Sequence, residues 1–221
     1  MVRGFYVACL VVLSSVAAFS QVKSDPATVT FTLDFPGSIP GHYSFRIDQS
    51  GAAHYESSGK TLPEEEQDDS FTYDFAASEA TRQKIFDLAA QLGYFQKDLD
   101  SHRKNMAFTG KKTLMYKDAQ RAGTTTYNYT SDVAGQELTG LFQSLSATLE
   151  FGHRLEYAHR YQKLALAEEL KKMEESSRTS PIVEVQAIAP ILRQIINDPG
   201  VINVTRARAQ RMLESPPKGT N

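Results

Sequence analysis

The chain has 221 residues, 41% of them hydrophobic and 23% charged, and its formal net charge is −2. This length allows one or two domains with a hydrophobic core. The near-neutral charge, in a chain that begins like an exported protein, argues against nucleic acid as a partner.

The first 20 residues have the pattern of a secretory signal peptide. Arg3 precedes an apolar run at residues 5–16, and Ala18-Phe19-Ser20 places small residues where a signal peptidase reads. The run is too short to span a bilayer, so we expect cleavage before Gln21, export to the periplasm or beyond, and no membrane span afterwards. Because the single cysteine, Cys9, lies in this segment, the mature chain would have no disulfide, thiolate metal site or cysteine nucleophile.

Strand patterns follow. Three stretches alternate apolar and polar side chains with the period of half-buried strands: residues 29–35, 43–47 and 53–55. Turn-forming residues separate them, which predicts an antiparallel meander. Alternation resumes at residues 71–75, after an acidic run at residues 64–69 that is typical of a solvated loop.

A helix and a second hairpin come next. Ser78 can cap a helix that runs to about Leu92, with Gly93 as its stop. Residues 113–116 and 124–129 are two more strands joined by a short turn. Strands in series with helices on one face predict an α+β fold with an antiparallel meander sheet and a packed helix.

Residues 132–175 predict one very long helix, or two helices end to end, with no proline. The apolar stripe changes sides midway: Leu138, Leu141, Phe142, Leu145 and Leu149 share one face, and Phe151, Leu155, Ala158, Leu166 and Met173 lie roughly 120° around the axis. Because glycine costs about 1 kcal/mol relative to alanine inside a helix, we expect two packing units joined at Gly152.

After a linker at residues 176–181, two further helices are predicted, at residues 182–197 and 201–214. Pro190 should kink the first helix or start a new turn. The apolar run from Ile188 to Val201, followed by Ala207, Ala209 and Leu213, resembles a single HEAT-type helical hairpin, which implies a helix–turn–helix shape. Residues 151–164 with this hairpin are also similar to exported bacterial proteins without a known activity, which implies a recurring architecture.

Glu150, His153, Glu156 and His159 recur at three-residue spacing and twice give Glu-x-x-His, the unit that di-iron bundle proteins supply from two facing helices. Both copies lie on one helix here. His153 and His159 are separated by about 9 Å of rise, so one ion could bind only adjacent members. His153, Glu156 and His159 are candidate metal ligands that need partners from elsewhere; the alternative is a polar helix face making i,i+3 and i,i+4 pairs.

Other patterns give no catalytic constellation. Gly59-Lys60-Thr61 lacks the earlier glycine of a phosphate-binding loop, since position 54 is His54. Ser57-x-x-Lys60 and Ser101-x-x-Lys104 lack the other elements of a serine–lysine acylase. We therefore expect no catalytic residue and no cofactor.

The second half of the long helical stretch has more apolar surface than one small sheet can cover. We expect it to bury against the C-terminal hairpin, another protomer, or both, and we name as interaction residues Phe151, Leu155, Tyr157, Tyr161, Leu166 and Leu170. Tyr157 and Tyr161 form an aromatic edge with Leu164, which burial at an interface explains as well as a ligand platform does.

The sequence thus predicts a signal peptide at residues 1–20, an α+β domain at 25–149, a helical C-terminal unit at 150–215 and a disordered tail at 216–221. The expected function is that of an exported non-enzymatic interaction or structural module, which binds an unknown protein partner or forms a homo-oligomer. One alternative is an exported metal-dependent hydrolase or metal-binding protein that uses the His153, Glu156 and His159 face. Another is an inhibitor or chaperone-like module that acts through an uncharged edge strand of the sheet.

Overall fold

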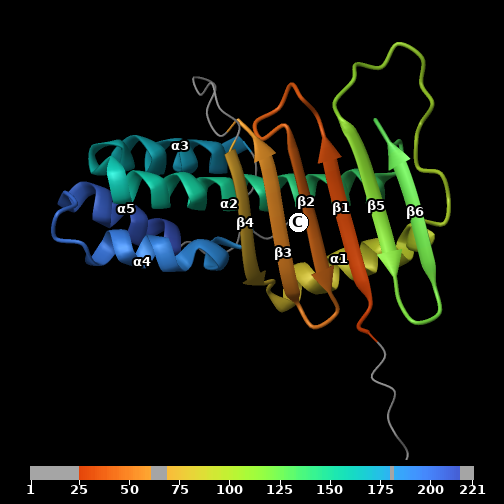
Figure 1. Cartoon of the computed structure of the whole chain (residues 1–221), viewed down its shortest axis with the longest axis horizontal. Helices are drawn as coiled ribbons and strands as arrows, with labels where there is room; N and C mark the ends of the chain where they lie inside the picture. Colours follow the sequence, from red (N-terminus) through yellow and green to blue (C-terminus); the bar gives the residue numbers. More distant parts are fainter. Residues whose placement is uncertain (1–24, 61–68, 180–181, 215–221) are drawn as a thin grey trace, which may run out of the picture.

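A computed structural model describes residues 25–60, 69–179 and 182–214 (Figure 1). The expected signal peptide, most of the acidic run at residues 64–69 and the expected tail at residues 216–221 lie outside these described parts. Within the described parts, none of the helices combines the length and the apolar character that crossing a bilayer requires.

The alternating segments build a six-stranded antiparallel sheet with the order β4-β3-β2-β1-β5-β6. Its strands are β1 (Thr28–Asp34), β2 (His42–Asp48), β3 (Ala52–Gly59), β4 (Asp69–Ala76), β5 (Lys111–Lys117) and β6 (Ala122–Tyr127). The first four strands form a meander and the last two form a hairpin. Because β5 pairs with β1, the first strand lies in the interior of the sheet, between β2 and β5. The α+β prediction is confirmed.

Helix α1 (Glu79–Gln91) begins and ends where its sequence signals lie. The Ser78 hydroxyl accepts a hydrogen bond from the Thr81 amide at 3.3 Å, which satisfies one of the unpaired amides of the first turn. After the helix, Gly93 has φ +60° and opens a short 3-10 turn, η1 (Gly93–Phe95), as a glycine at a helix end can. The apolar face of α1, with Ile85 and Leu88, is buried.

Helix α2 (Val133–Tyr161) crosses the same side of the sheet as α1 (Figure 1). The Asp132 carboxylate caps it by accepting from the amides of Ala134 and Gly135. Its Phe142 ring stacks on Phe31 of β1 with centroids 4.8 Å apart. This helix therefore closes the core on one face of the sheet and leaves the other face, with its threonines and charged side chains, uncovered by the described chain.

The long helical stretch is not one extended rod, and it does not break at Gly152. Helix α2 continues to Tyr161, Gln162 leaves helical geometry at φ −142° and ψ 57°, and a short 3-10 turn, η2 (Lys163–Ala165), leads into α3 (Leu166–Thr179). Helix α3 lies back alongside α2, where Arg154 Nε is 3.0 Å from Glu169 Oε2 (Figure 1). The fold-back lets Leu166 and Leu170 bury against the same apolar face that Leu155 supplies.

Gly152 serves close packing instead of a break. A β-carbon at this position would lie 2.5 Å from Cγ2 of Ile188, which belongs to a short element after α3. That element is the 3-10 helix η3 (Val185–Ile188), which leads into α4 (Ala189–Asn197). The glycine therefore marks where a neighbouring segment approaches the helix backbone.

The C-terminal hairpin consists of α4 and α5 (Asn203–Glu214). Pro190 lies in the first turn of α4, where its missing amide removes no helical hydrogen bond, so the proline starts a helix as one of its two expected roles. The helix expected from residue 182 begins later, because Glu184 has φ +56° and interrupts it. Both helices pack beside α2 and α3 at the end of the molecule away from β6 (Figure 1).

Alanine substitutions at two glycines of α2, one in close contact and one not, test this packing. Gly152→Ala should lower the free energy of unfolding by about 1–3 kcal/mol, because the added methyl overpacks against Ile188. Gly140→Ala should raise it by up to about 1 kcal/mol, because nothing lies within 4 Å of the new methyl and helix propensity improves. Urea unfolding followed by circular dichroism measures both; equal effects would contradict the assigned contact.

Candidate functional site

The candidate metal ligands on α2 have different partners. The His153 ring stacks on Phe71 of β4 at 4.1 Å, and its Nε2 is 3.7 Å from an Asp69 carboxylate oxygen. His159 Nε2 lies 2.9 Å from Asp198 at the start of the α4–α5 turn, whereas Glu156 is exposed between them. In the described parts of the chain, no group of three or more His, Cys, Asp or Glu side chains could hold a metal ion.

The space beside His153 is too small for a substrate. Tyr73, Glu156 and Ile188 help line a cavity of about 10 Å³ next to the imidazole. That volume corresponds to about one water molecule. The buried His153 Nδ1 has no hydrogen-bond partner among the described residues.

Four of the six expected interaction residues are core residues of the monomer. Phe151, Leu155, Leu166 and Leu170 are buried where α2 meets the helices that follow it. The chain therefore covers this face with its own C-terminal part, which was one of the options the sequence left open. Leu155, Leu166 and Leu170 are fully buried and Phe151 is 8% exposed, so these side chains cannot form a protein-binding surface in the folded monomer.

The other two, Tyr157 and Tyr161, lie on the surface with Leu164, and we call these three residues the tyrosine tip. Tyr157 is 53% exposed, Tyr161 65% and Leu164 94%. The two tyrosine rings lie 5.1 Å apart, one helical turn from each other. The tip extends from the last turns of α2 into η2, at the turn where the chain folds back.

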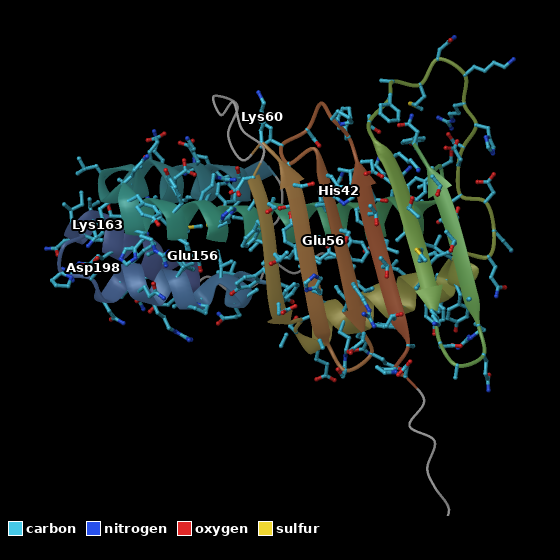
Figure 2. All side chains as sticks on the ribbon, viewed as in Figure 1. His42, Glu56, Lys60, Glu156, Lys163 and Asp198 are labelled. Carbon is cyan, nitrogen blue, oxygen red and sulfur yellow. The ribbon has the colours of Figure 1, made fainter. Side chains whose placement is uncertain are left out.

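An ion-pair cluster fixes the loop beside this tip. Asp198 Oδ2 is 2.6 Å from Lys163 Nζ, and the other oxygen, Oδ1, accepts from the Gly200 amide at 2.7 Å; Figure 2 shows Lys163 and Asp198 together. The Lys163 hydrogen bond, followed by the Gly200 amide, lowers the pKa of Asp198 to about 2. The cluster ties the α4–α5 turn to the end of α2.

A second polar group, inside the molecule, involves Glu150. Its Oε1 accepts hydrogen bonds from the Tyr55 and Ser57 hydroxyls of β3, each at 2.7 Å. Burial, reinforced by the nearby Glu150 charge, raises the pKa of Tyr55 far above its usual value, so the phenol remains a donor. Sequence reasoning placed Glu150 only in the Glu-x-x-His pattern; its position beside the apolar stripe, next to Leu149, was the available signal of burial.

Another open pocket does not supply a free binding group. It measures about 340 Å³ and lies between the end of α1 and the start of α2, with Asp98, Asp100 and Asp132 in its lining. All three carboxylates already accept local hydrogen bonds, from the amide of Asp100, the amides of His102 and Asn128, and the first-turn amides of α2. They organise the loop and the helix start.

The uncharged edge strand that would favour an inhibitor or chaperone-like role is present but covered. Strand β6 has no charged residue and lies at the edge of the sheet. Residues 93–101 run along it: the Leu99 amide donates to Thr125 Oγ1 at 3.1 Å, and a β-carbon on Gly123 would lie 2.1 Å from the Tyr94 carbonyl oxygen. The opposite edge strand, β4, has Asp69 and Asp74, which disfavour strand addition.

Comparison of the sequence with models of known protein families gave no match, and comparison with curated proteins found no significant relative. The function is therefore inferred from the sequence and from the geometry of the molecule.

Replacing Asp198 by Asn should make the protein less stable at neutral pH. Because the pKa of Asp198 is lowered in the folded state, from 3.8 to about 2, its contribution is fully present above about pH 4 and disappears as the pH falls through about 2. The difference in melting temperature between wild type and Asp198→Asn should shrink over that interval. Asp87→Asn, on the exposed side of α1, is the control; a pH-independent difference for Asp198→Asn would contradict the ion pair.

Proposed function

We propose that this is an exported, non-enzymatic protein that binds a partner protein through the tyrosine tip. The observation that carries the proposal is the exposure of the tip: Leu164 is 94% exposed, three residues after Tyr161, and the exposed rings of Tyr157 and Tyr161 contact each other at a tilt. Single exposed apolar residues are ordinary on protein surfaces. Three of them within eight residues, at a turn that an ion-pair cluster holds in place, form a ready contact surface.

The residue types of the tip support recognition of a protein. Tyrosine and arginine are enriched where interfaces have their strongest contacts, because they combine apolar area with hydrogen-bonding groups. Arg160 lies in the same turn, with its guanidinium 5.9 Å from the Tyr161 ring centre. A partner protein that covers the two tyrosine rings would also contact the Arg160 guanidinium at the edge of the interface.

The metal-dependent alternative has less support. His153 and His159 pair with different carboxylates, Glu156 is exposed, and the described residues contain no cluster of metal ligands. Metal analysis of protein purified without a histidine tag remains its direct test.

The export part of the proposal rests on the sequence of the first 20 residues. Intact-mass analysis of the protein from the producing cell's exported fraction should give a chain that begins at Gln21. A chain that retains residues 1–20 and stays in the cytoplasm would contradict it.

The tip can be tested by photo-cross-linking in the producing cells. A photoreactive phenylalanine analogue at Tyr161 should give a defined adduct with one other protein, and the additional changes Tyr157→Ser and Leu164→Ser should abolish it. The same analogue at Gln136, on an exposed part of α2, is the control. An adduct only with a second copy of the chain would identify a homo-oligomer, and no tip-dependent adduct at all would refute the proposal.

A further inference from the structure

A further pocket lies between the β1–β2 loop and α2, and none of its lining residues belongs to the tyrosine tip. Its volume is about 290 Å³, near the lower end of the roughly 300–1,000 Å³ of small-molecule sites. Leu33, Tyr43 and Phe151 give it apolar walls, and Glu150 supplies a carboxylate. We call it the carboxylate pocket.

Glu150 is only 5% exposed, yet its hydrogen bonds are one-sided. Oε1 accepts hydrogen bonds from both hydroxyls of β3, whereas Oε2 accepts none from the described residues and is not one of their fully buried unpaired atoms. A buried carboxylate is costly unless it is paired or fully hydrogen-bonded. The oxygen without a donor belongs to a side chain that lines the pocket, so a ligand there could supply what the protein does not.

Arg154 also lines the pocket, but it pairs with Glu169 and does not neutralise this carboxylate. Arg154 follows Glu150 by one helical turn, a spacing at which glutamate and arginine usually pair. Here Arg154 Nε donates instead to Glu169 of α3 at 3.0 Å, and its guanidinium lies 4.4 Å from the Phe151 ring centre. The pocket thus contains an acidic group whose expected partner is held by another helix.

We propose that the carboxylate pocket binds a small molecule that has a protonated amine attached to an apolar body. The ammonium donates to Glu150 Oε2, and the apolar part contacts Leu33, Tyr43 and Phe151. A protonated amine fits because a charge-assisted hydrogen bond to a buried carboxylate is stronger than one from a neutral donor. This site is independent of the tyrosine tip.

The test uses the whole mature chain and phenethylamine, with 2-phenylethanol as the neutral ligand of similar shape. Titration followed by NMR or calorimetry should show saturable binding of the amine and at least about tenfold weaker binding of the alcohol. Glu150→Gln should weaken amine binding by at least about tenfold, since it removes the charge but keeps an acceptor for Tyr55 and Ser57. Glu56→Gln, on the uncovered face of the sheet (Figure 2), is the matched control and should bind like wild type.

A second variant tests the pocket even if Glu150→Gln does not fold. Ala147 is exposed on α2 and lines the pocket, so Ala147→Trp should block amine binding while it leaves the buried carboxylate intact. The tip variant Tyr157→Ser with Leu164→Ser should bind the amine normally, which separates this site from the proposed partner surface. No saturable amine binding by wild type, equal binding of the alcohol, or unchanged binding by Glu150→Gln and Ala147→Trp would overturn the proposal.

Discussion

Both halves of the molecule depend on α2, because this one helix buries apolar side chains first against the sheet and then against the C-terminal helices. Its early turns place Phe142 against Phe31 and Phe45. Its later turns place Leu155 against the segments that follow it. If the helix bent between these two contacts, the sheet and the C-terminal helices would lose their common support.

Helix α2 passes from the sheet to the C-terminal helices near residues 148–152, and all five of these residues are buried. A charged side chain in such a buried stretch needs polar partners. Glu150 lies in this stretch, and the hydroxyls of Tyr55 and Ser57 compensate one of its oxygens. Gly152 lies there too, because Ile188 packs where its side chain would be. The carboxylate pocket is thus a result of the same transition that joins the two halves.

The surfaces that remain exposed after this packing are the ones that other molecules can contact. The C-terminal helices cover the apolar face that looked available in the sequence, so the large apolar residues left exposed where α2 passes into η2 are those of the tyrosine tip. Residues 93–101 cover the uncharged sheet edge at β6, which leaves little room for strand addition there. The exposed tyrosine tip at the fold-back turn and the small pocket at the helix transition are two features that this packing leaves open.

The sequence by itself determined the local elements, because each has a signal within a few residues. Alternation predicted the first four strands, strand-forming residues around a short turn predicted the last two, and Ser78 and Gly93 bounded α1. Pro190 predicted either a kink or a new turn. The sequence also determined that the apolar stripe of α2 must change neighbours, since periodicity reports which side of a helix is buried.

Only the tertiary structure decided which neighbours those are. Periodicity cannot distinguish a straight continuation from a fold-back at Gln162, since Leu166 and Leu170 keep a helical spacing in either case. It also cannot show that β5 would pair with β1, or that Ser57 and Glu150, far apart in the chain, would share a hydrogen bond. Those contacts depend on long-range packing free energy, which local patterns limit but do not specify.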